Sequence, residues 1–175
     1  MPINTAKSSQ QFYSMLVIEQ GPLDEMYRDA LQSFPDECCG FFFGKELAEE
    51  RIVTSVLVVN NAKEGDKRRR FEISPKDYLN AERFADERAL HLLGVYHSHP
   101  NHPAIPSEHD RVAAQPYFSY LIISVNENEV AGLRSWRLND NFQFTEEAIE
   151  NQIIINQNKK NGDDHNSNSI TKIYK

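Results

Sequence analysis

The sequence predicts an α/β (α+β) domain, and three observations support this class. The chain has 175 residues, a length that fits one domain with a sizeable core. In its first half, segments with the apolar period of a helix alternate with apolar segments typical of buried strands. In its second half, two apolar segments are separated by four polar residues, as in a hairpin. No internal repeat is present in the sequence.

The first elements expected are a strand, a helix and two further strands. A short strand at Phe12–Glu19 precedes a helix at Leu23–Ser33, whose apolar residues follow the helical period. Pro35 ends this helix. Glu37–Gly44 (ECCGFFFG) is then a mostly buried strand, and the β-branched residues of Ile52–Val59 predict another.

The middle of the chain predicts a loop, a helix and a strand. Asn60–Arg70 is polar and ends in the basic run Lys67–Arg70, which is either a solvated face or a contact with a partner. Ser74 can cap a helix at Lys76–Leu92, which has a proline immediately before it and an apolar stripe that suits it to cover a sheet. Leu93–Tyr96 resumes a strand.

The second half predicts an irregular segment, a short helix and two strands. Three prolines make His99–Pro106 irregular, and Ser107–Ala114 begins like a helix. Tyr120–Val125 and Val130–Leu138 are the two strands of the hairpin. The last segment, Asn156–Lys175, is rich in Asn and Ser and has too little apolar surface to order itself, so we expect a flexible tail.

Composition argues against a membrane or nucleic-acid protein. The formal net charge is −7, and it becomes −9 for residues 1–155, because the tail carries +2. An acidic body disfavours non-specific binding to phosphates. No run approaches the roughly 18 apolar residues of a membrane span, and Met1–Gln11 is too polar for a signal peptide. We therefore expect a cytoplasmic protein.

The two cysteines, Cys38 and Cys39, are adjacent. Neighbouring side chains on a strand point to opposite faces, which disfavours a disulfide between them. We expect two reduced thiols packed in or beside the core.

The most informative stretch is His97-Ser98-His99-Pro100, followed after six residues by Ser107-Glu108-His109-Asp110. Two histidines two positions apart on a strand share a face, so His97 and His99 can reach one metal ion. Asp110, in the first turn of the next helix, can supply a third ligand. Two imidazoles and one carboxylate, with a fourth position open, are the composition of a catalytic rather than a structural zinc site.

Each part of this stretch also has a simpler interpretation. The His-x-His pair can be two ordinary, partly exposed histidines, and Ser107 with Asp110 can form a helix capping box.

A separate carboxylate, Glu37, lies at the start of an apolar strand. Burial there would raise its pKa toward the range useful for a general base.

Together these residues resemble the signature of the JAMM (MPN-plus) metallopeptidases, a Glu in an early strand followed by H-[S/T]-H-P-x6-S-x-x-D. The matching residues are Glu37, His97, Ser98, His99, Pro100, Ser107 and Asp110. The stretches ECCG, RFEISPKDYLNAER and GVYHSHPNHPAIPS also look like the compact bacterial members. The resemblance implies a single MPN/JAMM (cytidine-deaminase-like) domain at residues 12–150, with a mixed curved β-sheet flanked by helices, before a tail at 156–175.

The resemblance implies a role for each matched polar residue. His97, His99 and Asp110 would hold one Zn²⁺ per chain. Glu37 would accept the proton of the attacking water and pass it to the leaving amine, while Ser107 would stabilise the oxyanion. No substrate-binding residue is assigned.

Other residues of this region are expected to have simpler roles. His102 and His109 fall outside the signature and are expected to be exposed or to lie behind the ligands. Ser98 should point away from the two histidines, and Gly40 is expected to allow close approach of the backbone. Trp136 is expected in the core.

The implied reaction is hydrolysis of the amide bond after the C-terminal Gly-Gly of a ubiquitin-like or ThiS/MoaD-type sulfur-carrier protein. Both precursor trimming and release of an attached amino acid remain open, as does the oligomeric state. Two alternatives are a RadC-like protein linked to DNA repair and a non-catalytic MPN scaffold. The RadC-like alternative is disfavoured by Asn101-His102 in place of Ser-Gly, by the lack of a preceding helix-hairpin-helix segment and by the acidic body. The scaffold alternative is disfavoured because the metal ligands are retained.

Overall fold

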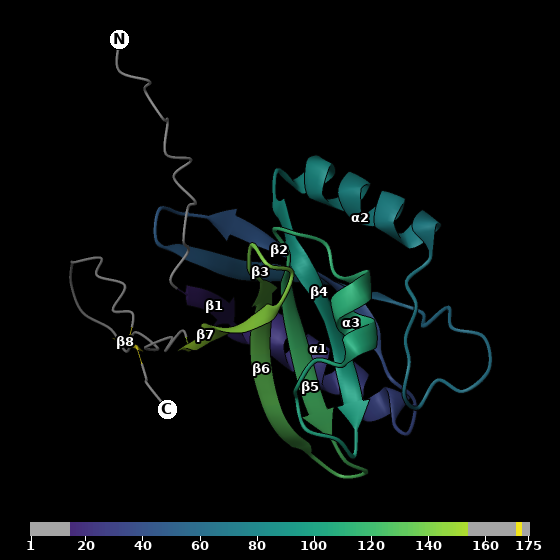
Figure 1. Cartoon of the computed structure of the whole chain (residues 1–175). Helices are drawn as coiled ribbons and strands as arrows, with labels where there is room; N and C mark the ends of the chain where they lie inside the picture. The colour runs from purple at the N-terminus through teal and green to yellow at the C-terminus, as the bar shows by residue number, and fades with distance from the viewer. Residues whose placement is uncertain (1–14, 154–170, 173–175) are drawn as a thin grey trace.

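The strands form one mixed sheet that closes on itself in this computed structural model, which describes residues 15–153 and 171–172 (Figure 1). The strand order is β1-β3-β2-β4-β5-β6-β7-β8, and β1 also pairs with β7. Strand β1 is parallel to β3 and β7, and β4 is parallel to β5, whereas the other neighbours are antiparallel. The strands are β1 (Met15–Glu19), β2 (Cys39–Glu46), β3 (Glu50–Val59), β4 (His91–Pro100), β5 (Ser119–Val125), β6 (Val130–Leu138), β7 (Phe144–Ile153) and β8 (Thr171–Lys172).

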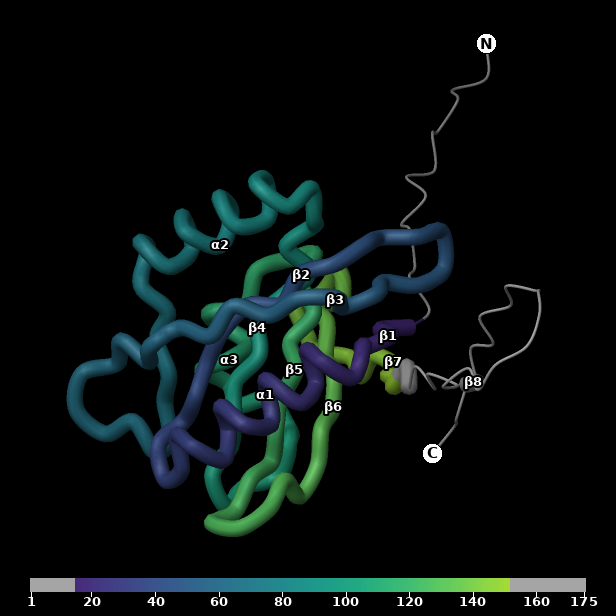
Figure 2. The backbone as a smooth tube through the Cα atoms, turned by 180° about the vertical axis from the view of Figure 1, so that it is seen from behind, coloured from purple at the N-terminus to yellow at the C-terminus, as the bar shows by residue number. Residues whose placement is uncertain are grey.

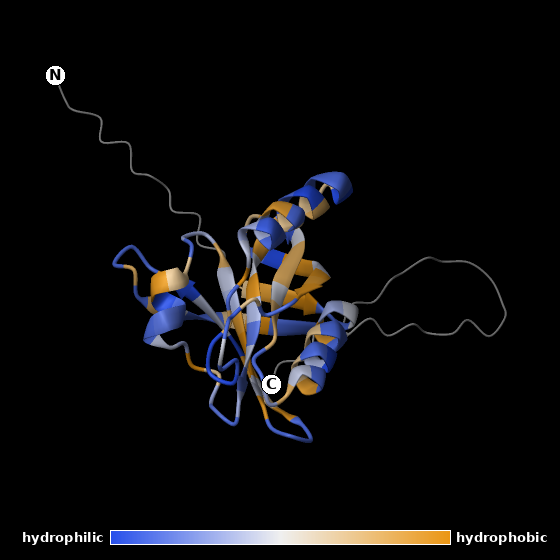
Figure 3. Ribbon diagram, turned by 90° about the vertical axis from the view of Figure 1, so that its right-hand side faces the viewer, coloured by the Kyte–Doolittle hydropathy of each residue, from blue (hydrophilic) through white to orange (hydrophobic). Residues whose placement is uncertain are grey.

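Helices cover both faces of the sheet, which confirms the α/β class. Helix α1 (Gln20–Ser33) crosses one face, the nearer one in Figure 2, and α2 (Pro75–Arg88) packs on the other. The short helix α3 (Glu108–Ala113) follows β4. Apolar residues gather on the strands between these helices, and the helices expose polar faces (Figure 3).

The alternation of side chains along β2 divides the core into two clusters. Cys38, which directly precedes β2, and Phe42 pack with α1, whereas Cys39, Phe41 and Phe43 pack with α2. This follows from the two-residue period of a strand. Both cysteines are free and buried, as expected.

Several element boundaries differ from the sequence prediction. Helix α1 begins at Gln20, and α2 ends at Arg88, because Ala89 adopts a left-handed conformation (φ 51°) that closes the helix. Strand β4 therefore begins at His91. The prediction that residues 99 and 100 are irregular was wrong, since β4 pairs with β5 as far as Pro100.

Strand β7 was not predicted, and its charged residues explain why. Glu147 lies in β7 but is buried, because Arg51 of β3 forms an ion pair with it at 2.8 Å. The hydroxyls of Ser119 and Ser135 donate to its other oxygen at 2.6 and 2.7 Å. This cluster joins β3, β5, β6 and β7, so a charged strand becomes part of the interior and completes the closure of the sheet.

Parts of the prediction fall outside the described residues. These are residues 12–14 of the first strand and most of the predicted tail at 156–175, of which the structure describes Thr171–Lys172, paired with β7. Among the helices in the described part of the chain, none is long and apolar enough to cross a membrane.

Candidate metal centre

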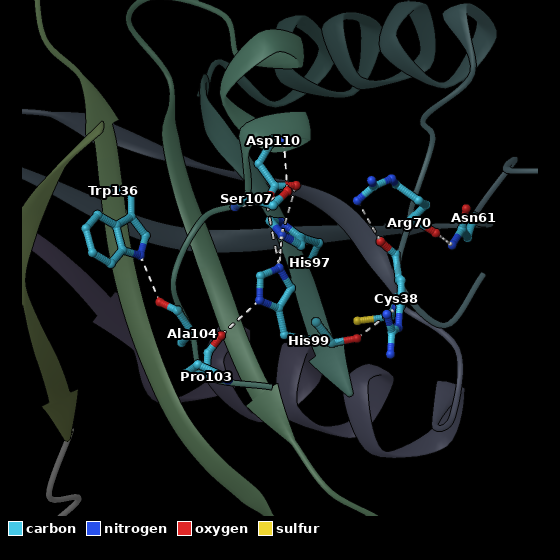
Figure 4. Close-up of polar contacts among 12 residues, drawn as sticks. Cys38, Asn61, Arg70, His97, His99, Pro103, Ala104, Ser107, Asp110 and Trp136 are labelled. Atoms are coloured by element: carbon cyan, nitrogen blue, oxygen red, sulfur yellow. Dashed lines mark hydrogen bonds and ion pairs between the residues drawn. The ribbon is translucent and has the colours of Figure 1, made fainter. Parts of the chain in front are cut away.

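Three side chains from β4 and α3 bring their polar atoms together (Figure 4). The Nε2 atoms of His97 and His99 are 3.0 Å apart. Asp110 places Oδ1 at 3.5 Å from His97 Nε2 and Oδ2 at 3.7 Å from His99 Nε2. All three residues are buried. The two histidines therefore share a face of β4, as their spacing predicts, and α3 supplies the carboxylate.

This group has the donors and spacing that suit a small dication. Ligand atoms at about 2.0–2.1 Å from a tetrahedral zinc ion lie about 3.3 Å from one another. The two imidazole nitrogens are 3.0 Å apart, and they lie 3.5 and 3.7 Å from the two different oxygens of Asp110, all close to that value. Imidazole nitrogens with a carboxylate oxygen are donors that zinc accepts, and three protein ligands leave a fourth position for a reactant. The residues present thus fit a catalytic metal ion.

Neighbouring groups orient the two imidazoles. The Nδ1–H of His99 donates to the carbonyl of Pro103 at 2.9 Å, which leaves its Nε2 as the atom with a lone pair. The ring of His97 stacks on Phe71, with centroids 4.4 Å apart. His97 Nδ1 is buried without a hydrogen-bond partner among the described residues. Phe71 and Pro103 were not identified from sequence, because neither belongs to a polar pattern.

Burial and mutual contact set the protonation of these three residues. Burial lowers the pKa of His97 to about 4, so its imidazole is neutral at pH 7. Burial also opposes ionisation of Asp110 and His99, but their mutual contact outweighs it, so the pKa of Asp110 is lowered and that of His99 is raised. Contact with the histidines and Ser107 thus keeps the Asp110 carboxyl ionised at neutral pH, the form that binds a metal ion.

Ser107 caps helix α3 and holds Asp110. Its hydroxyl oxygen accepts a bond from the Asp110 amide at 3.2 Å, and its own amide and hydroxyl donate to Asp110 Oδ2 at 2.6 and 2.7 Å. The capping-box interpretation is confirmed. It is compatible with the metal-site interpretation, since the cap fixes the carboxylate that faces the histidines.

Glu37 lies next to the metal group because of the register between β2 and β4. Cys39 pairs with His97, and continuing this antiparallel register by two residues places Glu37 opposite His99, on the same face. Two bonds support this continuation: Ser98 N–H donates to Cys38 O at 3.2 Å, and Cys38 N–H donates to Ser98 Oγ at 2.9 Å. Ser98 therefore points to the opposite face, as predicted.

The environment of Glu37 makes it a weaker acid than an ordinary glutamate. It is buried, and burial raises its pKa to about 7, with Asp110 adding to the effect while the charges of His99 and Arg70 oppose it. At neutral pH such a carboxyl is close to half-ionised. It can both accept and return a proton, as a general base requires.

Asn61 fastens the loop between β3 and α2 to Glu37. Its side-chain amide donates to the carbonyls of Glu37 and Arg70, both at 3.0 Å, and its oxygen accepts from the amides of Lys63 and Glu72 at 3.0 and 3.1 Å. Sequence reasoning missed Asn61, because one asparagine in a polar loop carries no pattern.

The remaining residues singled out from the sequence lie where they were expected, with one difference. His102 and His109 are exposed. A Cβ at Gly40 would overlap the ring of Tyr96 and the carbonyl of Leu57, so close approach does require glycine there. Trp136 is half-buried rather than fully in the core, and its indole donates to Ala104 O at 3.0 Å, fixing the loop after β4.

Comparisons with known proteins identify the family of this chain. The family described as prokaryotic homologs of the JAB domain matches residues 19–139. A desampylase of Pyrococcus furiosus is 28% identical over 145 residues, covering 83% of this chain and 96% of that protein. A probable TtuB-protein conjugate cleaving protease of Thermus thermophilus is 29% identical, with 64% and 72% covered. The solution structure of a protein from Desulfitobacterium hafniense has a TM-score of 0.70 at 30% identity, with 78% and 92% covered. The chain belongs to the family of prokaryotic homologs of the JAB domain.

Proposed function

We propose that this chain is a zinc metallopeptidase that hydrolyses the amide or isopeptide bond after the C-terminal Gly-Gly of a ubiquitin-like or sulfur-carrier protein. The observation that carries the proposal is the convergence of His97, His99 and Asp110 beside the buried carboxyl of Glu37. The substrate class rests on the relatives whose names describe a desampylase and a conjugate-cleaving protease. We also propose that the fold is of the cytidine-deaminase-like type, as the resemblance to the JAMM family implies.

The reaction needs a metal, a base and a donor. His97, His99 and Asp110 would hold the zinc ion, which would supply a Lewis acid for the amide carbonyl and increase the acidity of water. Glu37 takes a proton from the attacking water and returns it to the leaving amine. Burial raises the pKa of Glu37 in the metal-free site, which makes its carboxylate a stronger base than that of an exposed glutamate.

Ser107 can stabilise the oxyanion after a small movement. In the present arrangement its hydroxyl hydrogen points to Asp110 Oδ2 at 2.7 Å. Rotation about the Cβ–Oγ bond turns that hydrogen toward a substrate oxygen, while the amide of Ser107 keeps its bond to Asp110. Removal of a preorganised donor costs about 3 kcal/mol in the transition state, so a hydroxyl that must first turn away from Asp110 should contribute less than this.

A cysteine-peptidase mechanism does not fit the buried thiols. Burial raises the pKa of Cys39 to about 12 and raises that of Cys38 further. A thiol nucleophile must ionise near neutral pH, and neither does so in these surroundings.

The test is mass spectrometry of sulfur-carrier proteins extended beyond Gly-Gly, incubated with the zinc-loaded chain. We expect release of the extension by the wild type, loss of cleavage with retained zinc in Glu37→Gln, and loss of both in His97→Ala and Asp110→Asn. His109→Ala is the matched control, because this exposed histidine lies beside Asp110 but outside the group, and it should keep zinc and cleavage. Unchanged turnover in Glu37→Gln would remove Glu37 from its role.

A further inference from the structure

The basic run Lys67–Arg70 is joined at both ends to the residue that bears the proposed base. The amide of Glu37 donates to the carbonyl of Lys67 at 2.8 Å. The side chain of Asn61 binds the carbonyls of Glu37 and Arg70. The three arginines are exposed. Cationic side chains therefore emerge from a segment that cannot move independently of Glu37.

This run stands out against the charge of the rest of the domain. Residues 15–153 contain 14 Lys and Arg against 24 Asp and Glu, a formal charge of −10. Four of the 14 cations are consecutive in this loop. An anionic group that approaches the site is thus repelled by most of the body and attracted at this loop.

The loop lies on one defined side of the metal group. Figure 4 shows Arg70 and Asn61 on one side of His97, His99 and Asp110, and Trp136 on the other. The positive charge of Arg70 acts on Glu37, where it opposes the rise in pKa. Because Glu37 hands its proton to the leaving amine in the proposed reaction, the side of Glu37 and Arg70 is the leaving-group side.

We infer that Arg70, assisted by Arg69, selects substrates whose leaving group carries a carboxylate close to the scissile nitrogen, as in a C-terminal amino acid or a short acidic extension. This inference rests on the proposed function and concerns its specificity. A guanidinium binds a carboxylate through two parallel N–H donors, which a neutral amide cannot match. A lysine side chain in an isopeptide bond brings no such carboxylate of its own.

The experiment compares two peptides with the same sequence up to Gly-Gly. One continues Asp-Glu with a free C-terminus, and the other continues Asn-Gln with a C-terminal amide, so the two differ in charge but barely in shape. The ratio of their kcat/KM values is measured within one enzyme preparation. For the wild type at low salt we expect the acidic peptide to be favoured by about two- to fivefold, the range of an exposed ion pair. The ratio should approach one in about 0.5 M salt, where charges are screened.

Variants of the loop should change this ratio in a graded way. Arg70→Lys should retain a preference for the acidic peptide, Arg70→Gln should bring the ratio close to one, and Arg70→Glu should invert it. Arg69→Glu is a second variant, which should lower the ratio without altering the charge nearest to Glu37. Lys45→Glu is the matched control, an equal charge change on an exposed residue at the far end of β2, and should leave the ratio unchanged.

The outcomes separate this inference from the proposed function. If both peptides are cleaved at equal rates, or if Arg70→Glu and Arg69→Glu both keep the wild-type ratio, the inference about the loop is overturned and the peptidase stands. If zinc-loaded wild type cleaves neither the peptides nor an extended carrier protein, the proposed function fails and takes the inference with it.

Discussion

Replacing Glu37 with glutamine is expected to stabilise the metal-free protein at pH 8 and to have little effect near pH 4.5. In the fold, burial raises the pKa of Glu37 from its ordinary 4.5 to about 7. A group whose pKa is raised on folding stabilises the protein fully below its unfolded pKa and loses that contribution as pH rises through the folded pKa. At about 1.4 kcal/mol for each tenfold change in proton affinity, ionised Glu37 disfavours folding by about 3 kcal/mol.

Urea denaturation, followed through the fluorescence of Trp136, measures this effect. Both proteins are freed of metal with a chelator, and the free energy of unfolding is determined from pH 4.5 to pH 8.5. The difference between Glu37→Gln and wild type should grow from pH 5 to about pH 7 and then level off. Both proteins retain His99 and Asp110. Subtracting the unfolding free energy of one protein from that of the other therefore cancels most of the contribution from the titration of these two residues.

A matched variant isolates the cause. Glu82→Gln removes the same charge from an exposed position on α2, and its stability difference from wild type should stay within about 0.5 kcal/mol at every pH. A flat difference for Glu37→Gln across the range would mean that Glu37 is not desolvated beside the histidines. Glu37 would then lack the raised pKa that suits it to act as the general base.

Three further predictions concern the metal, the buried ion pair and the helix cap. Zinc at 100 times its dissociation constant should stabilise the metal-free wild type by about 2.7 kcal/mol in thermal unfolding. His97→Ala should abolish this gain in stability. If His97→Ala retains the gain, the assignment of His97 as a ligand is wrong. Glu147→Ala should lower the free energy of unfolding by about 3–5 kcal/mol in urea denaturation, since it deprives the buried Arg51 of its carboxylate partner at 2.8 Å. The double change Arg51→Met and Glu147→Leu should cost less. Equal losses of stability in the two variants would argue against the ion pair as the cause. Ser107→Ala should lose about 1 kcal/mol of stability, because it removes the cap of α3. It should also weaken zinc binding about 10–100-fold, measured by competition with a chelator, because Asp110 loses a hydrogen bond. Ser107→Thr should restore most of the stability and most of the zinc affinity.

The sequence determined the parts of this protein that depend on local pattern. The period of α1, the apolar run of β2 and the hairpin strands β5 and β6 follow from neighbouring residues, so they were predicted with small errors at their ends. The shared face of His97 and His99 also follows from the two-residue period of a strand, and the capping of α3 follows from Ser107 and Asp110 three positions apart.

Only the tertiary structure decided what depends on residues distant in the chain. Strand β7 is charged, and it becomes a strand because Arg51, far away in sequence, neutralises Glu147 inside the sheet. Glu37 faces His99 because β2 pairs with β4 in one register, and a shift of one residue would turn its carboxyl to the opposite face. Asn61 then fixes the basic loop beside that carboxyl through bonds to two carbonyls that no sequence pattern connects. Periodicity is a property of consecutive residues, whereas register, burial and the partner of a charge are properties of the folded chain.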